Sequence, residues 1–354
     1  LVEVSPHLAR SLRYRYMRWS IPRWTEADGV YRPDQETARL LESQSLRRRS
    51  FSPTALQHFA ACPYRFLLSA IHRLRPRDEM AALEQIDPLT RGSLFHDTQF
   101  RLFQSLKKDG LLPMSEANRQ EVLDRADQVL EETAEQYREE LAPAIPRVWA
   151  AEIEDVRTDL RGWIRTVIQE NADWKPVHFE FAFGLKDRQL ADAASTPKPA
   201  KVLDGYRIRG SIDLVEQSSF TGALRVIDHK TGRPPFPLPR QVGGGEHLQP
   251  VLYALAAEDV LERDVDAGHL FYCTQRGGYR SLVISLDDEA RARMRQTLQT
   301  VEREIDNGFL CAAPRADACK FCDFVPVCGP YEEQRAGRKI QQPLKRLEEL
   351  RRLP

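Results

Sequence analysis

The sequence predicts an α/β or α+β core: a mixed central sheet flanked by helices, with a helical insertion. Stretches of helical periodicity fill much of the first half of the chain, and strand-like segments begin near residue 176. A helix separates the first strands from two later ones, and another helix follows them. With 354 residues, the chain can form one large or two ordinary domains with a real hydrophobic core.

Helices are indicated by capping residues and by apolar residues at helical spacing. Ser52 followed by Pro53 starts the first clear helix, and Cys62-Pro63 interrupts it. The predicted helices cover residues 52–71 (with that interruption), 92–106, 116–141, 147–171, 246–261 and 287–307, and a basic helical tail covers 340–352. The two charged helices form an insertion at about residues 110–172, whose Glu/Arg content is typical of a solvated exterior.

Strands are indicated by alternating or apolar runs bounded by turn residues. They are expected at "VHFEFAFGL" from about residue 176, and at residues 208–215, 224–230, 267–273 and 279–285. The Ala/Pro-rich residues 187–201 are expected to form a surface loop. Segments 208–215 and 224–230 should pair as a hairpin in which Val215 faces Val226 and residues 218–223 form the loop.

The second strand of this hairpin ends in an acid and a base, Asp228 and Lys230. Because side chains on a strand alternate faces, these two lie on the same side. In the hairpin register, Asp213 lies opposite Asp228, with Cβ atoms roughly 5 Å apart. Two carboxylates this close repel each other unless a cation lies between them. An acid and a lysine at a strand end are often just a solvated pair, but the facing acid predicts a divalent-metal site with a lysine beside it.

The six cysteines do not resemble a secreted disulfide framework, because no secretory signal accompanies them. Cys319-x2-Cys322-x5-Cys328 forms a tight cluster, and Cys62 is a fourth candidate from the other end of the domain. Soft thiolate ligands select zinc, copper or an iron–sulfur cluster. Zinc stays open as the alternative metal, although the second CxxC of a zinc ribbon is missing. Cys273 and Cys311 are interpreted as non-ligands.

The net charge is zero, with 52 basic and 52 acidic residues, so overall charge does not indicate a nucleic-acid partner. The first fifty residues differ, because arginines, including the run 47–49, alternate there with tyrosines and tryptophans. This pattern suits either a nucleic-acid strand or a segment docked on a partner domain. Without a secretory signal or an apolar run of roughly 20 residues, we expect a cytoplasmic protein that does not span a membrane.

Several short motifs occur in an order that resembles the RecB-family branch of the PD-(D/E)XK nucleases. They are Gly92-x3-His96, Gly210-Ser-Ile-Asp213, Asp228-x-Lys230 and Gln249-x3-Tyr253, the last pair lying on one helix face. The cysteine pattern is similar to the iron–sulfur nuclease modules of that branch, found in AddB-type helicase–nuclease subunits and CRISPR-adaptation nucleases. The resemblance covers about residues 51–331. It implies a restriction-endonuclease-like core with a four-cysteine [4Fe–4S] clasp joining its two ends.

The resemblance also implies how the chain is divided. Residues 1–50 would link a preceding helicase-like region to the nuclease domain at 51–331, and residues 332–354 would form the basic tail. The chain opens in mid-pattern at Leu1, so we interpret it as a piece of a longer polypeptide. It contains no GxxxxGK[ST] phosphate loop.

The expected activity is metal-dependent DNA hydrolysis with Mg²⁺ or Mn²⁺, carried out on single-stranded ends beside a helicase partner in double-strand-break repair. Asp213 and Asp228 are the expected metal carboxylates, and the resemblance adds His96 and the backbone carbonyl of His229. The remaining expected site residues are Lys230, which would orient the attacking water, and Gln249 and Tyr253, which would support it or the substrate. Glu180 is a possible extra acid that is left unassigned. The rivals are a catalytically inactive DNA- or partner-binding module of the same fold and a zinc-stabilised nucleic-acid scaffold.

Overall fold

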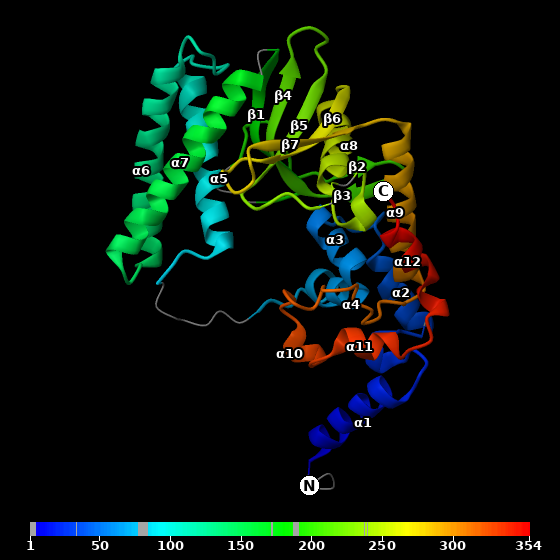
Figure 1. Cartoon of the computed structure of the whole chain (residues 1–354). Coiled ribbons are helices and arrows are strands. Elements are labelled where there is room, and N and C mark those ends of the chain that lie inside the picture. The colour runs from blue at the N-terminus through cyan, green and yellow to red at the C-terminus, as the bar shows by residue number, and fades with distance from the viewer. Residues whose placement is uncertain are drawn as a thin grey trace.

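The computed structural model describes residues 5–32, 34–76, 84–170, 173–186, 191–236, 238 and 240–354. Its centre is a five-stranded sheet with the strand order β1-β4-β5-β6-β7 (Figure 1). These strands are β1 (Trp174–Phe183), β4 (Gly210–Ser218), β5 (Leu224–Lys230), β6 (Val265–Tyr272) and β7 (Arg280–Ser285). β5 and β6 are parallel and the other neighbours antiparallel, which confirms the predicted mixed sheet.

Helices cover both faces of the sheet (Figure 1). One face packs against α5 (Pro88–Lys108), α6 (Arg119–Leu141) and α7 (Pro146–Glu170). The other packs against α3 (Pro53–Ala61), α8 (Gln249–Leu261), α9 (Asp288–Asp306) and α12 (Lys345–Arg351), together with the small hairpin of β2 (Ala200–Val202) and β3 (Tyr206–Ile208). Within the described ranges, none of the helices combines the length and apolar character that crossing a bilayer requires.

Shorter elements gather at the other end of the molecule from the sheet (Figure 1). They are α1 (Pro6–Ser20), α2 (Gln35–Ser43), α4 (Pro63–Phe66), α10 (Val325–Cys328) and α11 (Glu332–Gly337), with helical turns at Glu26–Asp28, Leu67–Ile71 and Gln342–Leu344. A further turn at Gly243–Gly245 packs against α3 and α12. The described part of the segment interpreted as a linker is therefore helical. It is tied to the C-terminal segment by buried ion pairs of Asp28 with Arg335 (2.6 Å) and Lys339 (3.0 Å).

The predicted hairpin register is confirmed, because Val215 pairs with Val226. The prediction of a surface loop at residues 187–201 is confirmed for most of residues 191–199, which form turns and irregular structure, but Asp192 is buried and β2 begins at Ala200. Asp192 accepts hydrogen bonds from the backbone N–H groups of Phe179 (3.1 Å) and Ala194 (2.8 Å). A buried carboxylate that satisfies backbone donors holds this turn against β1. Residues 187–190 lie outside the described residues.

Helix α8, which connects β5 to β6, lies unusually close to the sheet at Gly268. A Cβ atom at that position would come within 2.0 Å of the backbone oxygen of Pro250, a distance no real Cβ tolerates. The absence of a side chain at Gly268 therefore sets the depth at which α8 packs. Because Gln249 and Tyr253 lie on α8, the same glycine sets how far they reach past the sheet.

Replacing Gly268 by alanine should lower the free energy of unfolding by about 3 kcal/mol, because the clash is with backbone and cannot be relieved by a rotamer change. Urea unfolding followed by circular dichroism measures this. Gly337→Ala is the matched control, because Gly337 is exposed at the end of α11 with nothing within 4 Å of the added atom. We expect the control to leave stability unchanged or slightly higher. Equal effects at the two sites would contradict the close-approach explanation.

Candidate active site

The two strands that carry the predicted acids separate at those acids. The pairing of β4 with β5 runs from Gln217–Leu224 to Leu214–Ile227 and stops one residue before Asp213 and Asp228. Beyond that point β4 stays paired with β1, as far as the pair of Gly210 with Phe183. The strands therefore form a fork. A cavity of about 580 Å³ lies at this fork.

The cavity brings together all the metal and catalytic residues expected from the sequence. They come from α5, β4, β5 and α8, and they are His96, Asp213, Asp228, His229, Lys230, Gln249 and Tyr253. The side chains of α5 reach the cavity from one face of the sheet and those of α8 from the other. The fork is the place where groups from both faces can meet.

Asp213 is held by two of these neighbours. Its Oδ2 accepts a hydrogen bond of 2.6 Å from the backbone N–H of His229 and lies 3.4 Å from Nδ1 of His96. The imidazole of His229 is buried with its ring edge-on to Trp163 at 5.6 Å, and its Nδ1 lies 3.8 Å from Oδ2 of Asp213. Both the side chain and the backbone of His229 therefore lie beside Asp213, and the backbone carbonyl stays a predicted metal ligand.

Asp228 is fixed between two partners. Its carboxylate forms an ion pair with Lys230 and accepts a hydrogen bond of 3.0 Å from Nε2 of Gln249. Burial opposes the charged form of Lys230, but the carboxylates of Asp228 and Asp213 outweigh it and raise the lysine pKa. Lys230 is therefore a cation at neutral pH, suited to holding an anion or a water molecule and not to accepting a proton.

Glu180 belongs to this site, although sequence reasoning left it unassigned. Ligand atoms of His96, Glu180 and Asp213 all lie within 4.8 Å of one another, a spacing that one metal ion can bridge. Ser211 donates a hydrogen bond of 2.9 Å to Oε2 of Glu180. The backbone of Glu180 has a φ of 51°, in the left-handed region that a glutamate rarely adopts. The available signal was one acid within the aromatic run "HFEFAF", a run otherwise expected to be buried.

The electrostatics of the cavity favour a bound cation. Burial, followed by the negative charges of Asp228 and Glu180, raises the pKa of Asp213 well above its usual value. Burial lowers the pKa of His96, which leaves its imidazole neutral and able to donate a lone pair. Carboxylate oxygens with one imidazole nitrogen form a ligand set that fits Mg²⁺ and, because imidazole is softer, Mn²⁺.

Tyr253 explains the glycine of the Gly210-Ser-Ile-Asp213 motif. A Cβ atom at Gly210 would lie 2.8 Å from the Tyr253 ring, so only glycine lets the ring cover this part of β4. Burial, together with the charges of Asp228 and Asp213, raises the pKa of the Tyr253 hydroxyl. The phenol therefore stays protonated, and it can donate a hydrogen bond into the cavity.

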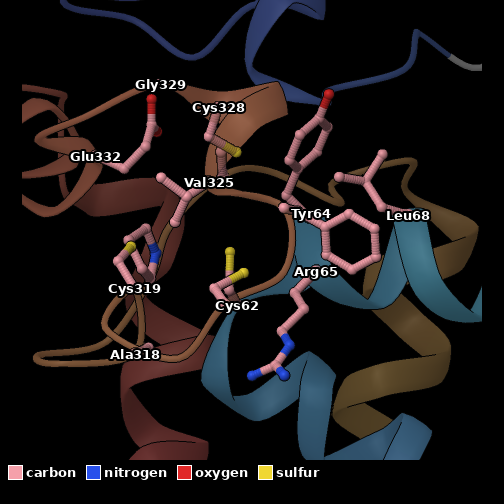
Figure 2. Close-up of a pocket in the computed structure, with 14 residues that line it drawn as sticks. Cys62, Tyr64, Arg65, Leu68, Ala318, Cys319, Val325, Cys328, Gly329 and Glu332 are labelled. Carbon is pink, nitrogen blue, oxygen red and sulfur yellow. The ribbon is translucent and has the colours of Figure 1, made fainter. Parts of the chain in front are cut away.

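The four cysteines predicted as ligands line a second, largely apolar cavity (Figure 2). Cys62 comes from the break between α3 and α4, and Cys319, Cys322 and Cys328 come from the segment leading through α10. Cys273 and Cys311 are buried elsewhere and do not line this cavity.

Without a metal, the thiols of Cys62, Cys319 and Cys328 hold their protons. Burial raises the pKa of Cys319 and of Cys328 to about 12, and it also raises the pKa of Cys62. Metal binding at such a site must therefore displace protons from the thiols.

Comparison with known proteins agrees with this geometry. The family described as the PD-(D/E)XK nuclease superfamily matches residues 50–329, a range that includes both cavities' predicted ligands. No match was found among curated proteins. A mixed sheet flanked by helices, with acids and a lysine at a strand fork, accords with the family match over most of the chain. The chain belongs to the PD-(D/E)XK nuclease superfamily.

Proposed function

We propose that this chain is a divalent-metal-dependent deoxyribonuclease that degrades single-stranded DNA from its ends. The observation that carries the proposal is the fork cavity. There His96, Glu180 and Asp213 converge within 4.8 Å, and Asp228 is paired with Lys230 beside them. The superfamily consists of nucleases that use divalent metals, and this ligand set is of the kind they require.

The residues at the fork divide the work of phosphodiester hydrolysis. His96, Glu180, Asp213 and Asp228 would hold a divalent cation, which supplies Lewis-acid polarisation of the phosphate and lowers the pKa of an attacking water. Lys230, positively charged, holds the water and offsets the negative charge that develops on the phosphoryl oxygens. Gln249 fixes the orientation of Asp228 through its hydrogen bond.

The role within a helicase–nuclease of double-strand-break repair rests on the resemblance to RecB-family and AddB-type modules. It is supported by the basic, aromatic helix α1 at the start of the chain, which contains arginine and tyrosine but no acid. In that arrangement, a helicase partner would deliver one strand to the fork. A catalytically inactive binding module of the same fold is the alternative. The intact pair of Asp228 and Lys230 argues against it.

We also propose that Cys62, Cys319, Cys322 and Cys328 hold a [4Fe–4S] cluster. Four thiols from two distant parts of the chain line one largely apolar cavity, and the resemblance to iron–sulfur nuclease modules favours a cluster there. Zinc bound by four thiolates stays the alternative.

Asp228→Asn should lower the rate of degradation of end-labelled single-stranded DNA in Mg²⁺ or Mn²⁺ at least about a hundredfold, because several kcal/mol of metal-assisted stabilisation is lost. Gel electrophoresis of the labelled products measures it. Asp266→Asn, an exposed acid of β6, is the matched control and should keep full activity. If cluster-loaded, folded wild-type protein cuts nothing in either metal, even with a helicase partner, the inactive binding module is the better explanation.

Glu180→Gln separates metal binding from folding. Removing one carboxylate should weaken Mn²⁺ binding at least about tenfold in isothermal titration, because affinity depends on the number of charged ligands. In a chelator, the same change should leave the melting temperature equal or higher, since Glu180 repels Asp213. Asp97→Asn is the control, because Asp97 lines the cavity but accepts its hydrogen bond from Tyr137. Unchanged Mn²⁺ affinity in Glu180→Gln would remove Glu180 from the ligand set.

Cys322→Ala should lower both the iron content and the melting temperature, because metal binding and folding of the clasp are coupled. Iron and zinc per chain are measured by elemental analysis, with visible absorbance as a second readout. Cys273→Ala, a buried cysteine outside the cavity, should lose some stability while keeping its metal. Zinc in place of iron would contradict the cluster, and unchanged melting and metal content in Cys322→Ala would contradict the clasp.

A further inference from the structure

Three arginines gather at one corner of the molecule, and one of them, Arg209, lies two residues before cavity-lining Ser211. The guanidinium of Arg49 lies over the Phe51 ring at 4.9 Å, and its Nη2 donates to the backbone oxygen of Ala70 at 2.5 Å. The backbone N–H of Arg209 donates to the oxygen of Phe51 at 3.0 Å. Arg73 follows Ala70 by three residues, with a left-handed backbone at φ 56°. The charges of Arg73 and Arg209 act, after burial, to lower the pKa of Arg49.

Among the residues that the structure describes, the cluster of Arg49, Arg73 and Arg209 has no carboxylate partner. Within the described parts of the chain, none of the three guanidinium groups forms an ion pair with a carboxylate, and Arg49 bonds only to neutral oxygens of Gln44 and Ala70. Three like charges held close together raise the free energy of the folded protein unless an anion joins them. Guanidinium groups match phosphate oxygens in geometry and in charge.

Arg209 places the cluster beside the active site, just before the start of β4. Ser211 and Asp213 are alternate residues of that strand, and both line the cavity. Arg209 extends the same alternation one step beyond the strand, and its Cβ lies beside Gly184, next to cavity-lining Leu185. At about 3.3 Å per residue, Arg209 is about 13 Å from Asp213 along the chain. A strand stacked at about 3.4 Å per nucleotide covers this distance in about four nucleotides.

We infer that Arg49, Arg73 and Arg209 form a phosphate-binding cluster that grips the DNA strand about four nucleotides away from the scissile phosphate. This inference rests on the proposed nuclease function, which supplies the strand. The three residues act in positioning, because they touch the backbone of the substrate at a distance from the bond that breaks. Substrates shorter than about four nucleotides would reach the fork without reaching the cluster.

The test uses the double variant Arg73→Gln/Arg209→Gln, since Arg49 also supports the fold through Ala70. In an Asp228→Ala background, fluorescence anisotropy with a labelled 12-nucleotide oligo(dT) should show at least tenfold weaker binding. The slope of log affinity against log salt should fall by about 0.7 for each lost phosphate contact. Arg73→Lys/Arg209→Lys should keep most of the slope, because it keeps the charges. Arg138→Gln, on the remote helix α6, should change nothing.

Hydrolysis provides the second readout. With Asp228 intact, the ratio of kcat/KM for the 12-mer to kcat/KM for a dinucleotide should fall at least tenfold in the double Gln variant, through KM. If the wild type hydrolyses DNA but both this ratio and the salt slope stay unchanged, the inference is wrong and the nuclease stands. If no variant hydrolyses either substrate, the proposed function fails, and the anisotropy experiment still decides whether the cluster binds a strand.

Discussion

The separation of β4 from β5 at Asp213 and Asp228 determines where every other part of the site lies. Where two strands part, backbone N–H groups lose their ladder partners, and a buried N–H without a partner costs about 1–3 kcal/mol. The carboxylate of Asp213 replaces the missing ladder partner, because it accepts a hydrogen bond of 2.6 Å from the backbone N–H of His229. The same carboxylate is therefore both a structural cap and an expected metal ligand. Its orientation is set by the fold before any metal arrives.

The fork also concentrates negative charge that the protein balances only in part. Asp213, Asp228 and Glu180 lie near one another, and Lys230 pairs with Asp228. The raised pKa of Asp213 and the left-handed backbone of Glu180 both show free energy stored at this place. A ligand that binds only the folded state returns such free energy as stability. The site is thus built to be more stable with a divalent cation than without one.

The two ends of the described chain are joined by buried ion pairs. Asp28 is fully buried and pairs with Arg335, 307 residues away, while Arg18 pairs with Glu332 beside the cysteine cavity. Removing one partner of a buried pair typically costs about 3–5 kcal/mol. This ionic group joins α1 to α11, and the cysteines join the break between α3 and α4 to the segment that leads through α10. Because Glu332 lines the cysteine cavity, loss of either set should destabilise the other, although the sheet and the fork have a separate hydrophobic core on their far face.

The sequence predicted the parts of the site that depend on local periodicity. Period-two alternation put Asp228 beside Lys230, hairpin pairing put Asp213 at the fork, and helical spacing put Gln249 with Tyr253. The role of Glu180 was not predicted, because its position requires a residue with a left-handed backbone within a strand, and alternation does not predict such a residue. The partners Asp28 and Arg335 escaped because no local pattern relates residues so far apart. The sequence alone does show that Glu180 is unusual, because it is an acid within an aromatic strand-like run. Burying such an acid without a partner is costly, so a partner for Glu180 was to be expected. Burial cost therefore predicts a functional acid where periodicity alone does not.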